Sequence, residues 1–192
     1  MGSRLKLGAH WIEASSDRWR VDESSGEPVL QFDGRTHMEH VRNPEVALID
    51  CTANDYSVEA EMRFVANHLP DPGAGWFGFA LRAQDLQNCE IVWFMPRAWS
   101  GATVAYVPVA HGIVPWWAEA YATQKKGNVP IPDGEWFKAR ADVSGKRFTI
   151  YVNNELVFEK PLTYYVESGR PGFFVGTATD AEFRRVTVRA LG

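Results

Sequence analysis

Residues 76–93 constrain the fold of this chain most strongly, because they read as two apolar strands joined by one polar turn. Large apolar side chains alternate with small ones from Phe77 to Leu81, stop at the polar segment 84–88, and resume at Cys89. A period of two is the pattern of a β-strand, and a short polar interruption is typical of a hairpin. The stretch therefore predicts two antiparallel strands.

The same two-residue period recurs along most of the chain, and helical periodicity is almost absent. Residues 56–64 give the clearest strand pattern, because apolar and polar positions alternate without a break. Segments 136–143, 148–152 and 156–158 predict three more strands joined by short turns. About a dozen short strands of this kind favour an all-β fold, a two-sheet antiparallel jelly-roll sandwich.

Three stretches depart from this regular pattern. Residues 5–20 hold Trp11 and Trp19 in mixed polar surroundings and are assigned no strand. Residues 113–121 combine a proline with two adjacent tryptophans, which suits an edge strand or a rim loop. Residues 125–128 are expected to form a solvated connection.

Length and charge narrow the class of protein. A chain of 192 residues suits one domain, expected over residues 1–192, although residues 1–3 could derive from cloning. The net charge of −4, with no block of Lys or Arg, argues against a nucleic-acid partner. There is no apolar run of the roughly 18–20 residues that a membrane span needs, and no secretory core at the start. We expect a cytoplasmic protein as given, with secretion open if the amino terminus was trimmed.

The two cysteines, Cys51 and Cys89, are too few for a disulfide framework and lack zinc-ligand spacing. We expect both to be reduced. His37 and His40 have a spacing that could hold a metal ion, but a third ligand is missing. No metal and no cofactor is predicted.

Two segments resemble hairpins of the concanavalin A-like jelly rolls. Residues 78–94 are similar to a hairpin of the form apolar strand, Arg, Ala, x, Asp, x, x, Asn, and residues 133–155 to one of the form Gly-x-Trp, strand, turn, strand, Val-Asn-x. The likeness is to the laminin-G-like and 3-keto-disaccharide-hydrolase-like branch and covers about residues 25–190. It implies two curved sheets, with ligands on the concave sheet or its rim loops. Such folds host binding modules and enzymes alike, so the fold alone does not select an activity.

An acidic pair and an arginine give the first candidate site. Fructan-binding modules of similar architecture use an acid-x-acid pair on one strand and an Arg at the end of the next, and Glu59, Glu61 and Arg82 fit that pattern by position. The first acid is Glu here rather than the expected Asp. Carboxylates accept hydrogen bonds from sugar hydroxyls, and a guanidinium donates two in parallel. The alternative is a solvated face with an ion pair worth at most about 1 kcal/mol.

Aromatic side chains supply a second element of this site. Trp93, Trp116 and Tyr121 surround the same predicted hairpins, and flat rings can stack on the C–H faces of sugars. Because neighbouring residues of a strand point to opposite faces, Trp116 and Trp117 cannot both enter one core.

Acid–base chemistry is the rival reading. His111 lies within sequence reach of Glu119, and either Glu119 or Glu61 could act with it as a catalytic carboxylate. A glycoside hydrolase or lyase-like enzyme would need such a pair. Scattered histidines in loops more often have neither role, so these are weak candidates.

The sequence thus favours a lectin-like protein that binds a saccharide or another polyhydroxylated small ligand through Glu59, Glu61, Arg82, Trp93, Trp116 and Tyr121. The enzyme reading and a structural or protein-interaction module remain as alternatives, and homo-oligomerisation is left open.

Overall fold

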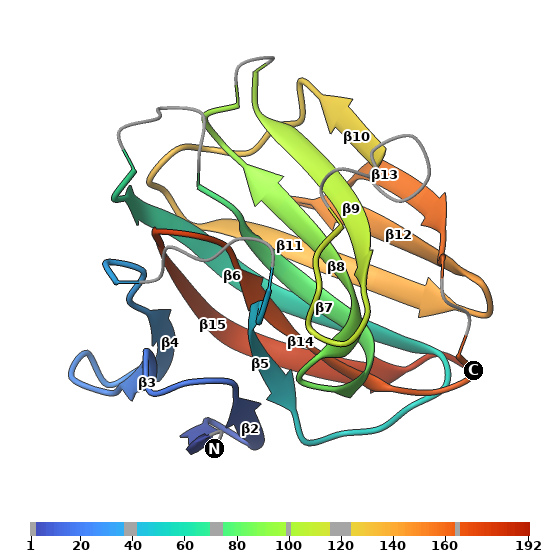
Figure 1. The fold of residues 1–192 in the computed structure, drawn as a ribbon, viewed down its shortest axis with the longest axis horizontal. Helices are drawn as coiled ribbons and strands as arrows, with labels where there is room; N and C mark the ends of the chain where they lie inside the picture. Colours follow the sequence, from blue (N-terminus) through green and yellow to red (C-terminus); the bar gives the residue numbers. More distant parts are fainter. Residues whose placement is uncertain (1–2, 37–41, 70–74, 99–100, 116–123, 164–165) are drawn as a thin grey trace.

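A computed structural model describes residues 3–36, 42–69, 75–98, 101–115, 124–163 and 166–192. Within these ranges all regular secondary structure is β-strand. The strands form two antiparallel sheets, so the predicted fold class is confirmed. None of the described segments is a helix that could cross a membrane. In the view of Figure 1 the larger sheet lies in front of the smaller one.

Sheet A has eight described strands. Their spatial order is β1 (Ser3–Leu7), β2 (His10–Ala14), β5 (Glu45–Ile49), β14 (Arg170–Val175), β7 (Phe77–Asp85), β8 (Asn88–Met95), β9 (Thr103–Val109) and β10 (Gln124–Gly127).

Sheet B has seven described strands. Their spatial order is β13 (Glu155–Pro161), β12 (Arg147–Val152), β11 (Phe137–Ser144), β6 (Tyr56–Asn67), β15 (Thr179–Ala190), β4 (Val29–Phe32) and β3 (Trp19–Asp22).

The core lies between the two sheets and is rich in phenylalanine. Phe77 on sheet A sits 6.0 Å, ring centre to ring centre, from Phe137 and 6.4 Å from Phe183, both on sheet B. The alternation predicted for residues 56–64 is confirmed, because β6 buries every second side chain from Tyr56 to Phe64. The inner face of each strand thus follows directly from its apolar positions.

The outer face of sheet A carries a second apolar layer. Its members are buried although they point away from the core: Val46, Leu48, Ala80, Ile91, Trp93, Ala105, Val107 and Phe174. Strands buried on both faces read as continuous apolar runs rather than as alternating ones. The run Thr103–Val109 of β9, buried at every position, shows this pattern.

Two expectations for the connecting segments were wrong. Residues 5–20 contain the end of β1, all of β2 and the start of β3, so the amino-terminal region is part of the sandwich. The segment predicted as a solvated connection at 125–128 instead contributes to β10, which pairs with β9 from Gln124↔Tyr106 to Gly127↔Thr103. A short, lysine-bearing strand is a common way to finish a sheet edge, because it satisfies the backbone groups of its neighbour.

Candidate functional site

Arg82 is fully buried at a bulge of β7 and does not face a wetted sheet surface. It is 1% exposed, and its backbone adopts a left-handed φ of 49° where the pairing of β7 with β8 shifts register. Its backbone N–H donates to the Tyr56 hydroxyl at 2.8 Å. The guanidinium donates to oxygens on three other segments: Asp55, Gly145, Val166 and Glu167.

The acid partner of Arg82 is therefore Asp55, and the predicted pairing with Glu59 or Glu61 is wrong. Asp55 Oδ1 lies 3.1 Å from Arg82 Nη2. The physical reason is the bulge, which adds a residue to one strand and redirects the side chain. Gly169 packs so closely against this point that a Cβ there would lie 2.5 Å from the Arg82 carbonyl carbon.

Glu59 and Glu61 lie on the outer face of sheet B and are ion-paired. Lys138 Nζ lies 2.9 Å from Glu59, while Arg184 and Arg185 each donate to Glu61 at 2.7 Å. Partial burial works to raise the pKa of Glu61, but the hydrogen bonds from the two arginines outweigh it and lower that pKa. The structure thus brings the two glutamates together with basic residues, on a different sheet from Arg82.

The other predicted site residues are only partly described. Trp93 is 2% exposed on the outer face of sheet A, with its indole N–H 3.2 Å from Met95 Sδ, so its ring is not open to solvent. Trp116, Tyr121 and Glu119 lie outside the described residues, as do His37 and His40.

His111 is exposed in the turn after β9, where its backbone N–H donates to Asn88 Oδ1 at 3.0 Å. Its predicted partnership with Glu119 stays a prediction. Within the described ranges, no three His, Cys, Asp or Glu side chains are arranged to hold a metal ion.

Two pockets flank the β7–β8 turn. One, of about 390 Å³, is lined by Arg82, Cys89, Glu90 and His111 among others, and it is mostly apolar. Burial raises the pKa of the Cys89 thiol, with a smaller contribution from the Glu90 carboxylate, so the thiol there is neutral. The second pocket is larger and more polar.

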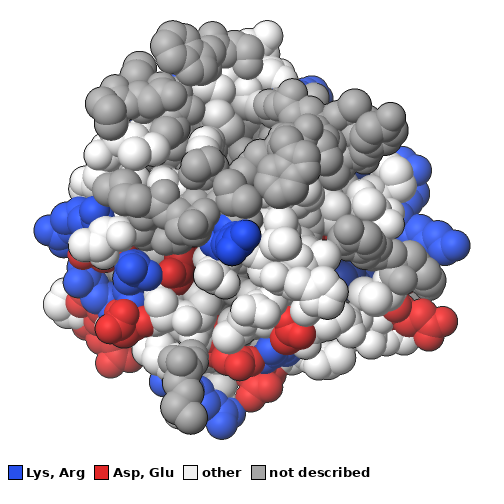
Figure 2. Space-filling model, viewed as in Figure 1, with Lys and Arg blue, Asp and Glu red and all other residues white. Residues whose placement is uncertain are grey.

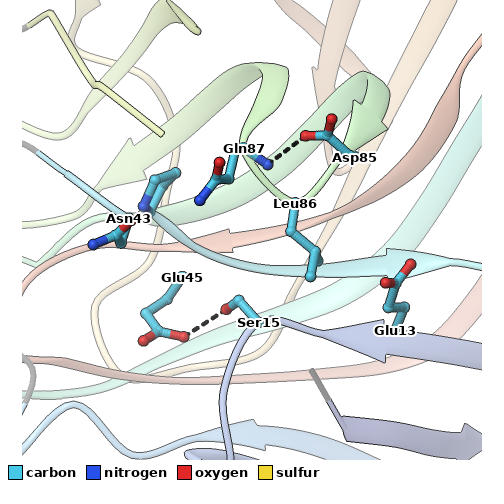
Figure 3. A pocket seen from close by; sticks show the side chains of 8 residues that line it. Glu13, Ser15, Asn43, Glu45, Asp85, Leu86 and Gln87 are labelled. Carbon is cyan, nitrogen blue, oxygen red and sulfur yellow. Dashed lines mark hydrogen bonds between the residues drawn. The ribbon is translucent and has the colours of Figure 1, made fainter. Parts of the chain in front are cut away.

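The larger pocket, here called the β2–β5 pocket, has a volume of about 480 Å³, within the range of small-molecule sites. It lies on the outer face of sheet A between the end of β2, the segment entering β5 and the β7–β8 turn (Figure 3). Its lining consists of Glu13, Ser15, Asn43, Pro44, Glu45, Asp85, Leu86 and Gln87.

Glu45 is fixed at one side of this pocket by a small network. Its carboxylate accepts hydrogen bonds from the hydroxyls of Ser15 at 2.6 Å and Ser16 at 2.7 Å, and from Arg18 at 2.9 Å. Ser15 also accepts from the backbone N–H of Val46 at 3.0 Å. The charge of Glu45 is thereby balanced, and the Ser15 hydroxyl is held at the pocket wall.

The β7–β8 turn forms the opposite wall. Asp85 accepts from the backbone N–H of Gln87 at 2.7 Å and from the Asn88 amide at 2.9 Å, so Asp85 caps the hairpin. The Leu86 side chain projects from the turn toward Ser15 and packs on the outer apolar layer (Figure 3). The turn therefore bends over the sheet and gives the pocket one apolar surface.

Glu13 supplies the most open carboxylate of the pocket. Its side chain is 46% exposed and accepts one hydrogen bond from Arg170 Nη1 at 2.6 Å. A carboxylate has about four acceptor positions, so most of this capacity is available to a ligand. The amides of Asn43 and Gln87 add donors, and the described lining contains no basic side chain.

Sequence reasoning assigned a binding role to none of the residues that line this pocket. The available signal was the alternation Trp11-x-Glu13-x-Ser15, which marks an outward-facing row on a strand that was not assigned. Acidic and basic side chains gather over the lower part of the face in Figure 2, the part that holds β2, β5 and the β7–β8 turn in Figure 1.

Comparisons with known proteins give structural neighbours only, since no family model and no curated protein sequence matches the chain. Carbohydrate-binding module CBM66 from Bacillus subtilis superposes with a TM-score of 0.69 at 15% identity, covering 97% of this chain and 99% of that one. A protein of unknown function with a galectin-like fold, also from Bacillus subtilis, gives 0.60 at 11% identity, covering 96% and 90%.

A toad ovary galectin in complex with thio-digalactose gives a TM-score of 0.50 at 13% identity, covering 80% of this chain and 99% of the galectin. At such identities the likeness establishes the jelly-roll sandwich alone. It is consistent with the concanavalin A-like resemblance of residues 78–94 and 133–155.

Proposed function

We propose that this protein is a lectin-like, concanavalin A-like sandwich that binds a neutral saccharide in the β2–β5 pocket. One observation carries the proposal: the pocket combines acceptors held in place with amide donors and one apolar wall. Glu13 and Asp85 present carboxylate oxygens, Asn43 and Gln87 present amides, and Leu86 presents the apolar surface. Sugars need this mixture, because they carry hydroxyl groups around an apolar ring.

The charge of the lining favours a neutral sugar over an acidic one. Arg170 balances Glu13 and Arg18 balances Glu45, while Asp85 accepts from two neutral donors, the backbone N–H of Gln87 and the Asn88 amide. A uronate would place a second negative charge near Asp85 and would be disfavoured. The names of two neighbours, a carbohydrate-binding module and a galectin in complex with thio-digalactose, support the ligand class without assigning it.

Calorimetric titration of neutral sugars and of a uronic acid tests the proposal. Glu13→Gln and Gln87→Ala change exposed groups of the pocket and should leave the fold intact. A lost hydrogen bond to a charged group costs about 1.5–3 kcal/mol, so we expect Glu13→Gln to weaken binding about 10- to 150-fold. Gln87→Ala should weaken it less, since the amide is neutral.

The matched control is Glu59→Gln, which makes the same chemical change on the outer face of sheet B. We expect it to bind like the unaltered protein. Loss of binding in Glu59→Gln with normal binding in Glu13→Gln would move the site to sheet B and refute the pocket. Failure of every neutral sugar to bind would refute the function itself.

A further inference from the structure

An outward-facing row of side chains on β2 leads from the β2–β5 pocket to an exposed tryptophan. Along this strand Ile12 and Ala14 are fully buried, whereas Trp11 is 45% exposed and Glu13 lies half-exposed beside it. Successive residues of a strand point to opposite faces, so Trp11, Glu13 and Ser15 follow one line on the outer face of sheet A. Ser15 continues the ladder, because its backbone N–H donates to the Val46 carbonyl at 2.9 Å.

Cross-strand register places this row on the same side of the sheet as the pocket. Glu13 pairs with Leu48 of β5, and Leu48 belongs to the outer apolar layer. Trp11 pairs with Lys6 of β1, so the ring lies on the same outer face toward the sheet edge. Along β2, the next outward-facing residue after Trp11 is Glu13, which lines the pocket.

Two cations hold the Trp11 ring in place. Arg4 Cζ and Lys6 Nζ each lie 4.9 Å from the ring centre, and Arg4 is in turn bonded to Asp50 at 2.9 Å. Cations over an indole orient the ring at modest cost, because the interaction is electrostatic and compatible with solvent. Trp11 is the only aromatic residue among the exposed large apolar side chains of the described ranges. The part of the indole that stays exposed beside Arg4 and Lys6 is the surface that a sugar ring would contact.

The length of the row sets the size of the ligand. Trp11 and Ser15 are four residues apart along an extended chain, which is about 13 Å at roughly 3.3 Å per residue. The pocket and the indole share this span, so a sugar ring held in the pocket against Glu13 and Gln87 leaves the indole for a second ring.

We infer that Trp11 is a stacking subsite next to the β2–β5 pocket, and that the ligand is a neutral oligosaccharide rather than a single sugar. The inference rests on the proposed function. One sugar would occupy the pocket against Glu13 and Gln87, and a neighbouring sugar would lay its apolar face on the indole. Affinity should therefore rise with chain length until the second contact is made.

The test is calorimetry with gluco-, galacto- and fructo-oligosaccharides of one to five units. For the series that binds, we expect affinity to rise about tenfold between one and three units and then to level off. Trp11→Ala should abolish this rise and keep the monosaccharide affinity, whereas Trp11→Phe should retain most of it. Leu156→Ala, an exposed apolar residue on β13 of sheet B, is the control and should keep both.

The outcomes separate the two proposals. If a monosaccharide binds, Gln87→Ala weakens it, and Trp11→Ala leaves the chain-length profile unaltered, the subsite is refuted and the pocket stands. If Trp11→Ala weakens all lengths equally, Trp11 acts on the fold and the subsite is again refuted. If no neutral saccharide binds, both proposals fail. In NMR spectra the Trp11 indole N–H, assigned by its loss in Trp11→Phe, should shift with the trisaccharide and not with the monosaccharide.

Discussion

Replacing Arg82 separates the sequence-based role of this residue from the one that its surroundings indicate. As a ligand-binding residue it would tolerate substitution with little loss of stability. As observed, it is 1% exposed and its guanidinium donates to a carboxylate on one segment and to carbonyls on two others. Arg82→Ala removes all of these hydrogen bonds at once. In the unaltered protein Arg82 therefore acts as a clamp. It ties the residues before β6 to the β11–β12 turn and to the segment before β14.

The magnitude follows from what the substitution leaves behind. Breaking a buried charged pair by deleting one partner costs about 3–5 kcal/mol, since the remaining groups lose their partners without regaining water. Asp55 reduces this cost, because its side chain is 36% exposed and can be solvated. The left-handed φ of 49° leaves this cost unchanged, because alanine keeps the Cβ that makes the left-handed region unfavourable. We therefore expect a loss of about 3 kcal/mol for Arg82→Ala.

Urea unfolding followed by circular dichroism measures this loss as a shift in midpoint at constant slope. At about 2–4 °C per kcal/mol for a chain of this size, the melting temperature should fall by roughly 6–12 °C. Arg147→Ala is the matched control, because Arg147 is 58% exposed and pairs with Glu159 at the surface. It should cost less than about 1 kcal/mol. A stable Arg82→Ala protein that has lost saccharide binding would overturn the clamp and restore the sequence-based role.

Three further predictions concern charge, reactivity and the sheet B glutamates. Hydrogen bonds from Arg35 lower the pKa of Asp33 to about 2, so its contribution to stability is present above pH 4 and lost between about pH 4 and pH 2. Acid titration of unfolding should show a smaller loss in Asp33→Asn, and an equal loss would refute the link. Cys89 is buried and the pKa of its thiol is raised, so a thiol reagent should modify only the half-buried Cys51 until the protein is unfolded. Two rapidly reacting thiols in the native protein would contradict this prediction. Glu59→Gln should lower the free energy of unfolding by less than about 1 kcal/mol, as equilibrium unfolding in urea would show.

The alternation of residues predicted the strands, but it did not predict whether the outer face of each strand is buried or exposed. The inner face of β6 follows from its alternating apolar residues, because one-face burial leaves that signature in any sequence. The row Glu13, Leu48, Gly172 and Ala80 shows the limit, since it crosses sheet A from a half-exposed carboxylate to fully buried residues. The exposure of each residue in this row depends on how far its strand lies from the edge of the sheet. No local sequence pattern encodes that position.

The structure does not bring Arg82 together with Glu59 and Glu61, for a related reason. Arg82 was expected on a strand face, and a bulge with a positive φ sends its side chain into the end of the sandwich instead. That geometry depends on Tyr56 and Gly169, which are far from Arg82 in the chain. The β2–β5 pocket joins three segments in the same way, so only the assembled sheet brings its residues together.

The distribution of charge over the two outer faces argues for the rim of sheet A as the binding surface. On sheet B, Glu59, Glu61 and Arg63 are all engaged with neighbouring charges, so a ligand would have to displace ion pairs there. At the centre of sheet A the outer face is apolar and buried, and it offers few groups to a hydroxyl. On β2, near the edge of sheet A, Glu13 keeps most of its acceptor capacity and Trp11 is 45% exposed. A saccharide bound there as proposed would displace none of the ion pairs of sheet B.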